Sequence, residues 1–204
     1  VYGFTMPLVT DSQGHKFGKS EGNALWLDKD KTSSYKLYQF FTNVEDEMVI
    51  DYLKIYTFLS KEEIEALELS NKTHPELREA HKALAKEIIT FLHGKDEYEK
   101  AVKLANSLFN NKFTDLTSNE IKELFSTEEV KEIELNKTLT DLLIDMKVAS
   151  SKREAREFIN GNAISINGVK ETNPEVIIDS KFLLDNTYII IKRGKKAYYL
   201  AKVK

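Results

Sequence analysis

The hydrophobic period of this chain changes once, near Thr138, and that change constrains the fold more than any other feature. Before this point apolar residues recur every three or four positions, which is the spacing of one face of an α-helix. After it, short alternating apolar stretches are separated by turn residues, as is typical of β-strands. The sequence therefore predicts an α+β chain: mainly a helical bundle, followed by a small α+β module with two helices and a few antiparallel strands.

Four segments follow from these patterns. Residues 1–32 read as loops and short extended pieces, and they are too few to fold alone. Residues 33–125 carry the helical period, residues 126–138 form an acidic linker with weak periodicity, and residues 139–204 form the module. The chain opens at Val1 without a methionine, so we expect a fragment of a longer protein.

Local signals mark several element boundaries. Two sequences of the S/T-x-x-E type, Ser60–Glu63 and Thr117–Glu120, predict capping boxes at the start of helices. Gly94 suits a C-terminal cap. In the module, Asn167-Gly168 predicts a tight hairpin turn, and Arg193-Gly194-Lys195 predicts a second one.

Composition excludes several classes of protein. The chain has no cysteine, which excludes disulfide scaffolds and thiolate metal sites and fits a reducing cytoplasm. No apolar stretch approaches the roughly 18 to 20 residues of a membrane helix, so we expect no membrane association. His74, His81 and His93 form no i, i+4 pair, so we interpret them as surface or capping residues and predict no metal site.

Charge is divided unevenly along the chain. The net formal charge is −3, but residues 1–138 hold 18 basic against 25 acidic side chains, whereas residues 139–204 hold 12 against 8. An excess of positive charge confined to one end favours a polyanionic partner at that end.

A lysine pair in the first segment has the chemistry of a phosphate contact. Lys16-Phe17-Gly18-Lys19-Ser20 places two flexible ammonium groups around a glycine, where they can reach phosphate oxygens such as those of a pyrophosphate leaving group. Such lysines also serve solubility in ordinary surface loops. A P-loop is excluded, because its GxxxxGK[ST] spacing is absent.

The module carries two basic clusters. At 100° per residue, Lys152, Arg153 and Arg156 fall within a stripe of about 100° on one predicted helix. The alternative is a solvated helix face with salt bridges to neighbouring glutamates. A second cluster lies on the last hairpin and comprises Lys192, Arg193, Lys195 and Lys196. Both clusters suit contacts with the phosphates of a polyanion, and such contacts set the position of the partner rather than read a sequence.

The order of these motifs resembles the C-terminal half of bacterial tyrosyl-tRNA synthetases. The likeness rests on Gly3 to Val9, on Gly14 to Ser20 with a KFGKS form of the class I KMSKS signature, on Leu25 to Asp28, and on Arg193 to Leu200. It covers nearly the whole chain. The family's nucleotide-binding domain, with its HIGH-type motif and tyrosine pocket, has no counterpart in these 204 residues.

The resemblance implies a function and site residues. The family activates tyrosine with ATP, accompanied by Mg²⁺, and transfers it to tRNA(Tyr); Lys16 and Lys19 would be catalytic and would stabilise the leaving pyrophosphate, with Ser20 helping to position the loop. The helical segment would be the anticodon-binding domain and the module would bind tRNA. The implied RNA-binding residues are Lys147, Ser150, Ser151, Lys152, Arg153, Arg156, Asn167, Lys192, Arg193, Lys195 and Lys196.

Further expectations complete this hypothesis. The full-length enzyme would be a homodimer through its catalytic domain, whereas this chain would be an inactive monomer. The alternatives are a stand-alone RNA-binding protein with a vestigial lysine loop and a structural helical adaptor, the latter leaving both basic clusters unexplained. Aromatic residues of the bundle are more typical of core packing than of base stacking; they are Tyr35, Tyr38, Phe40, Phe41, Tyr52 and Tyr56.

Overall fold

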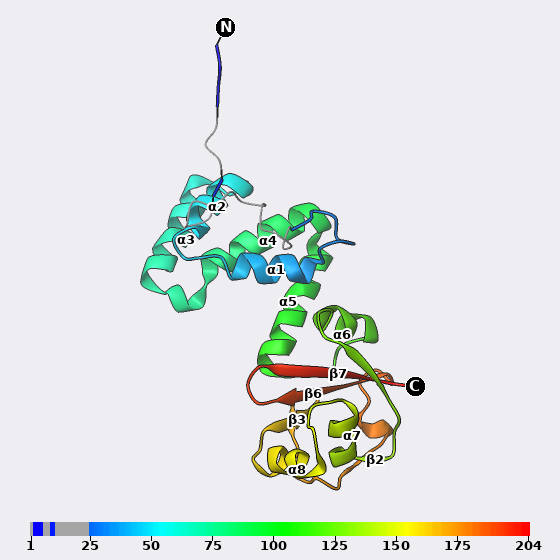
Figure 1. The fold of residues 1–204 in the computed structure, drawn as a ribbon. Helices are drawn as coiled ribbons and strands as arrows, with labels where there is room; N and C mark the ends of the chain where they lie inside the picture. The colour runs from blue at the N-terminus through cyan, green and yellow to red at the C-terminus, as the bar shows by residue number, and fades with distance from the viewer. Residues whose placement is uncertain (1, 6–8, 11–24) are drawn as a thin grey trace. The chain divides into compact units, whose positions relative to one another are not determined.

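The structure is a computed structural model that describes residues 2–5, 9–10 and 25–204. The chain divides into two compact units, an N-terminal unit (Val1–Lys103) and a C-terminal unit (Leu104–Lys204). Helix α5 (Lys95–Asn110) belongs in part to each. Figure 1 labels the helices and strands of both units.

The N-terminal unit is helical, as the apolar period predicts. Its central helix, α4, packs against three neighbours and fills the unit with small and branched apolar side chains such as Leu84 and Ala85, both 0% exposed (Figure 1). Apart from α5, the elements are α1 (Ser34–Thr42), α2 (Val49–Tyr56), α3 (Lys61–Thr73), the 3₁₀ turn η1 (Pro75–Leu77) and α4 (Glu79–His93).

Aromatic side chains of this unit mostly serve its core. Tyr35, Phe41 and Tyr52 are buried, which confirms the prediction of core packing for these three. Phe40 is an exception among the six, because 37% of its surface remains exposed. The helical period places it on the outer side of α1, one residue away from the buried stripe.

The predicted helix caps are confirmed. Ser60 and Glu63 close a capping box at the start of α3, where the Ser60 side chain accepts a hydrogen bond from the Glu63 amide and the Glu63 carboxylate accepts one from the Ser60 amide. Gly94 ends α4 with φ 92°, a conformation that glycine adopts without the steric cost of a side chain.

His81 is buried, and the interpretation of this residue as a surface or capping histidine is wrong. It lies on the inner face of α4 with 0% exposure, where Nε2 donates a hydrogen bond to the carbonyl of Val44 at 3.0 Å. Its Nδ1 has no hydrogen-bond partner among the described residues. Burial, together with the nearby positive charge of Arg78, lowers the pKa of His81, so the neutral ring is favoured.

The C-terminal unit has an α+β fold, which confirms the predicted class. Five strands form one sheet in the order β1-β7-β6-β3-β4, and two further strands, β2 and β5, pair separately. Its elements are α6 (Ser118–Leu124), β1 (Val130–Ile133), β2 (Lys137–Thr138), α7 (Leu139–Asp145), α8 (Lys152–Asn160), β3 (Ile164–Ile166), β4 (Val169–Lys170), β5 (Ile177–Ile178), η2 (Ser180–Phe182), β6 (Tyr188–Arg193) and β7 (Ala197–Val203).

Both faces of the sheet are covered by other elements of this unit. Helices α7 and α8 lie against one face (Figure 1), where Leu142, Leu143 and Ile159 join Ile189 and Ile191 of β6 in the main core. The opposite face is packed by aromatic rings: Phe125 follows α6 and contacts Tyr198 of β7, with ring centroids 5.4 Å apart, and Phe113 lies behind Phe125 at 6.0 Å. The sheet is thus enclosed between α7–α8 and the segment around α6.

The structure departs from the predicted limits of the domains. The division into units falls between Lys103 and Leu104, and the range 126–138, predicted as a linker, holds β1 and β2. Strand β1 pairs in parallel with β7 over four residues. It gives little periodic signal because Ile133 alone among its side chains is buried.

Candidate nucleic-acid interface

The predicted site residues fall in two places, of which the structure describes one. The lysine loop, Lys16 to Ser20, lies outside the described residues. All eleven predicted RNA-binding residues belong to the C-terminal unit and are described. In the described part of the chain, no group of three or more His, Asp or Glu side chains could hold a metal ion, and no helix is long and apolar enough to cross a membrane.

The start of α8 is fixed by its own capping residues. The Ser151 side chain accepts a hydrogen bond from the Glu154 amide, and both the amide and the hydroxyl of Ser150 donate to the Glu154 carboxylate at 2.6 Å. These bonds from Ser150 lower the pKa of Glu154. Ser150 and Ser151, which are predicted to bind RNA, thus have a structural role in positioning the helix that carries the basic stripe.

The stripe on α8 is present, and each of its charges is paired at the surface. Lys152 contacts Asp141 at 2.7 Å, Arg153 contacts Glu157 at 3.0 Å, and Arg156 contacts Glu175 at 3.1 Å. The basic side chains remain exposed, Arg153 to 90%. Exposed pairs of this kind contribute only about 0 to 1 kcal/mol, so a phosphate can displace the carboxylate.

Arg193, at the end of β6, packs against α8 and the turn that precedes it. Its guanidinium donates a hydrogen bond to the carbonyl of Val148 at 2.6 Å, and it lies over the ring of Phe158 at 5.2 Å and that of Tyr199 at 5.8 Å. The last hairpin is thereby joined to the turn between α7 and α8.

A hollow of about 460 Å³ brings three of the predicted residues together. Lys147, Ser150 and Arg193 line it, beside Glu154 and the apolar side chains of the α7–α8 turn. Lys147 is exposed, follows α7 and has φ 57°, an unusual conformation for a lysine. Its charge stands at the rim with no ion pair within 4.0 Å to a described residue.

Lys192 is directed away from this hollow. Successive side chains of a strand point to opposite faces of the sheet, so Lys192 and Arg193 are separated. The Lys192 ammonium group donates to the side-chain oxygen of Asn111 at 2.6 Å and lies 5.1 Å from the centre of the Tyr198 ring. The four basic residues of the hairpin therefore do not form one cluster.

Lys195 and Lys196 occupy the exposed turn between β6 and β7. Across the ranges that the structure describes, neither has an ion pair within 4.0 Å. Together with Lys147, they are exposed predicted RNA-binding cations with no ion pair within 4.0 Å among the described residues, so they are available to phosphate.

Asn167 has a structural role in the turn between β3 and β4. Its side-chain oxygen accepts a hydrogen bond from the Ile190 amide at 2.9 Å, and its side-chain nitrogen donates to the Phe182 carbonyl at 2.6 Å. With φ 51° at Asn167 and 91° at Gly168, the predicted tight turn is confirmed. The amide of Asn167 is thus engaged within the protein on both sides.

Sequence reasoning missed Asn111, which is partly buried and forms hydrogen bonds with Lys192 and Tyr198 of the β6–β7 hairpin. An asparagine directly after a helix is a recognised signal for a left-handed cap, and Asn111 does have φ 51° after α5. That signal indicates a helix end and gives no hint of a contact with residues some eighty positions later.

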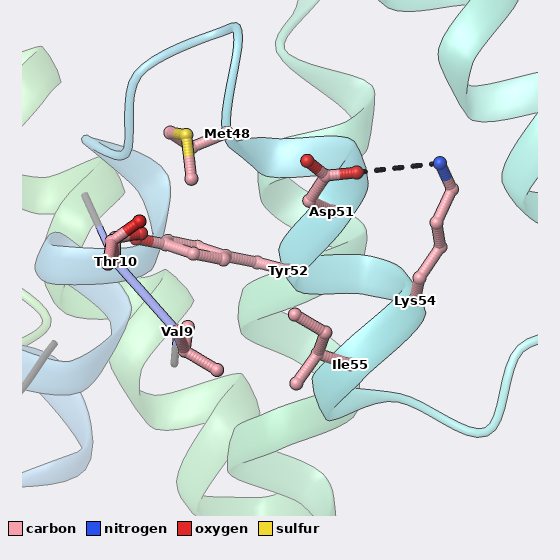
Figure 2. Close-up of a pocket in the computed structure, with 7 residues that line it drawn as sticks. All are labelled: Val9, Thr10, Met48, Asp51, Tyr52, Lys54 and Ile55. Atoms are coloured by element: carbon pink, nitrogen blue, oxygen red, sulfur yellow. Dashed lines mark hydrogen bonds and ion pairs between the residues drawn. The ribbon is translucent and has the colours of Figure 1, made fainter. Parts of the chain in front are cut away.

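The N-terminal unit has a smaller hollow of about 210 Å³ (Figure 2). Three side chains line one side of it: Met48, which directly precedes α2, and Tyr52 and Ile55 of α2. The Tyr52 hydroxyl donates a hydrogen bond to the carbonyl of Thr10 at 3.1 Å. Lys54, at its rim, pairs with Asp51 at 3.5 Å (Figure 2). None of the predicted site residues lines it.

Two protein-family models match the chain. The model described as tRNA synthetases class I (W and Y) matches residues 1–110, and the model described as the tyrosine–tRNA ligase SYY-like C-terminal domain matches residues 120–201. The two ranges follow one another in the chain and leave little of it unmatched.

Individual proteins are also similar to this chain. The tyrosine–tRNA ligase of Bacillus pumilus is 45% identical over all of this chain and 49% of its own length, and tyrosine–tRNA ligase 1 of Bacillus subtilis is 42% identical over the same shares. A solved structure titled as the solution structure of a tyrosyl-tRNA synthetase C-terminal domain is 32% identical, covers 46% of this chain and 95% of its own, and has a TM-score of 0.40. The chain spans about half the length of the curated relatives it matches.

Proposed function

The chain belongs to the class I tRNA synthetases (W and Y), and on that basis we propose that it is the tRNA-binding C-terminal part of a tyrosine–tRNA ligase. The whole enzyme would activate tyrosine with ATP, releasing pyrophosphate, and transfer the tyrosyl group to tRNA(Tyr). Mg²⁺ would accompany the ATP phosphates as part of the substrate. The observation that carries the proposal is the pair of family models, which match residues 1–110 and 120–201 in order.

The lysine loop supplies the catalytic part of the proposal. Lys16 and Lys19 are the two cations of the KFGKS sequence, and their charge would stabilise the pyrophosphate as it leaves. Without the adenine and tyrosine pockets, the loop has no partner that fixes the reacting groups in place. The 204-residue chain is therefore expected not to activate tyrosine.

In the whole enzyme, Lys19→Ala is expected to lower the rate of tyrosine activation by roughly two to three powers of ten, because one donor to the transition-state charge is lost. The affinity for tyrosine should change little, since the proposed role of this lysine is toward the pyrophosphate and not toward the amino acid. Pyrophosphate exchange, measured as kcat and KM for tyrosine, separates the two. Equal damage to both would assign the loop a folding role instead.

The C-terminal unit supplies the RNA-binding part. The exposed cations around the hollow and on the hairpin tip suit phosphates of a folded tRNA, and the basic stripe of α8 extends that surface. Phosphate contacts position the RNA without reading its sequence. The proposed RNA partner is tRNA(Tyr), and the proposed location of the enzyme is the cytoplasm. The whole enzyme would be a homodimer through its catalytic part, whereas this chain would be a monomer.

Replacing the stripe should weaken tRNA binding and flatten its dependence on salt. A triple variant, Lys152→Ala with Arg153→Ala and Arg156→Ala, removes up to three phosphate contacts, and each contact contributes about 0.7 to 0.9 to the slope of log K against log salt. The measurement is the affinity of the 204-residue chain for a tRNA(Tyr) transcript at several salt concentrations.

Thermal unfolding provides the control, because the three side chains are exposed and their loss should leave the fold intact. An unchanged affinity and slope in a folded triple variant would make the stripe a solvated helix face. Absence of tRNA binding by the wild-type chain at low salt would contradict the proposed function itself.

A further inference from the structure

We propose that Asn111 is a positioning residue of the RNA-binding hairpin formed by β6 and β7: it holds Lys192 on the face of the sheet opposite α7 and α8, so that the tip lysines, Lys195 and Lys196, carry the phosphate contacts. The inference rests on the proposed function, because it assumes that the hairpin binds RNA. It assigns Lys192 a structural role in place of the RNA contact predicted from its sequence context.

Asn111 joins the two strands of the hairpin through one atom. Its side-chain oxygen accepts a hydrogen bond from the Lys192 ammonium group at 2.6 Å and another from the Tyr198 hydroxyl at 3.1 Å. Lys192 and Tyr198 are directly opposite each other in the register of β6 and β7. The bond to Lys192 is charge-assisted, a class roughly twice as strong as a neutral hydrogen bond.

The backbone of Asn111 is itself held on two sides, so its side chain has a fixed direction. The Lys112 amide donates to the Ser107 carbonyl at 2.9 Å, which closes the end of α5, and Asn111 takes the left-handed conformation that this closure requires. On the other side, the Asn111 carbonyl lies against Gly168 in the β3–β4 turn, so closely that a Cβ atom there would be 1.7 Å from the oxygen.

The hairpin is thus braced on both faces just below its tip. On one face Lys192 is tied to Asn111; on the other, Arg193 donates to the Val148 carbonyl and lies over Phe158. The turn that follows carries Lys195 and Lys196, both exposed. A tip held in this way loses less conformational entropy when it binds, which raises affinity without a new contact.

The first experiment separates the side chain of Asn111 from its backbone conformation. Asn111→Gly keeps the left-handed conformation accessible and removes the acceptor, whereas Asn111→Asp keeps an acceptor for Lys192. With the 204-residue chain and a tRNA(Tyr) transcript, we expect Asn111→Gly to weaken binding roughly tenfold with an unchanged salt slope, since no phosphate contact is removed. Asn111→Asp should bind within about threefold of wild type.

The second experiment asks which lysines contact phosphate. Lys192→Met removes the charge and keeps the apolar stem, and it should lower the thermal stability of the unit while changing the salt slope by less than about half of one contact. The double variant Lys195→Ala with Lys196→Ala should do the reverse: its stability stays near wild type, and its slope falls by about 1.4 to 1.8.

The results distinguish this inference from the proposed function. A slope change in Lys192→Met as large as that of one tip lysine would make Lys192 a phosphate contact and overturn the inference. Unchanged tRNA affinity in a folded Asn111→Gly variant would overturn it as well. If the tip double variant bound tRNA like wild type, the hairpin would not be an RNA contact, and the proposed RNA surface would fail at this point independently of Asn111.

Discussion

Gly168→Ala is expected to lower the free energy of unfolding of the C-terminal unit by about 3 kcal/mol or more. The new Cβ atom would be 1.7 Å from the carbonyl oxygen and 2.8 Å from the carbonyl carbon of Asn111, and backbone atoms cannot move aside as a flexible side chain can. The left-handed φ of 91° adds a further cost for any residue with a side chain. Thermal and urea unfolding of the 204-residue chain measure the loss.

Gly94→Ala is the matched control for this prediction. Gly94 has nearly the same φ, 92°, but a Cβ atom built there meets nothing within 4 Å. Only the conformational cost remains; at φ 92° and ψ 164°, a region that glycine alone occupies readily, this variant should lose about 1 to 3 kcal/mol. Equal losses in the two variants would mean that the contact between Gly168 and Asn111 does not constrain the turn.

A fragment of residues 139–204 is expected not to fold cooperatively, whereas residues 104–204 should do so. The shorter fragment lacks β1, which pairs with β7, and it lacks Phe113 and Phe125, which cover the Tyr198 side of the sheet. Removal of one buried Phe side chain typically costs 3 to 5 kcal/mol, and small domains have a total stability of only about 5 to 15 kcal/mol. Circular dichroism during thermal unfolding compares the two fragments.

Amide hydrogen exchange measures, strand by strand, which parts of the two fragments are folded. In residues 104–204, the amides of β6 and β7 should be protected, because both strands lie inside the sheet order β1-β7-β6-β3-β4. A sharp, reversible melting transition of residues 139–204 at a temperature close to that of the longer fragment would contradict the prediction.

Features that depend on neighbours in the chain could be predicted from the sequence. The cap of α8 at Ser151, the capping box at Ser60 and the turn at Asn167-Gly168 are all set by residues within a few positions of one another. Their hydrogen bonds form wherever those local sequences occur. The amphipathic period of α2 is a similar local property: Val49, Tyr52 and Leu53 recur at helical spacing, and all three are buried in the core of the N-terminal unit.

Features that depend on distant partners could not be predicted in this way. The burial of His81 depends on the carbonyl of Val44, 37 positions earlier, and the position of Lys192 depends on Asn111, 81 positions earlier. Strand alternation does predict that Lys192 and Arg193 face opposite sides, but only the tertiary structure shows that each side already offers a partner. The basic hairpin was therefore found from the sequence, and its division into bracing and exposed residues was not.

The parallel pairing of β1 with β7 affects how this chain can fold during its synthesis. Val130 of β1 pairs with Leu200 of β7, which is synthesised 70 residues later. At synthesis rates of roughly 5 to 20 residues per second, this interval lasts about 3 to 15 seconds. An unpaired strand is a template for aggregation during that time, and flanking charges are the usual protection. Glu128, Glu129, Glu132 and Glu134 supply such charges within and beside β1, which is the charge pattern expected to limit aggregation of this segment before β7 is synthesised.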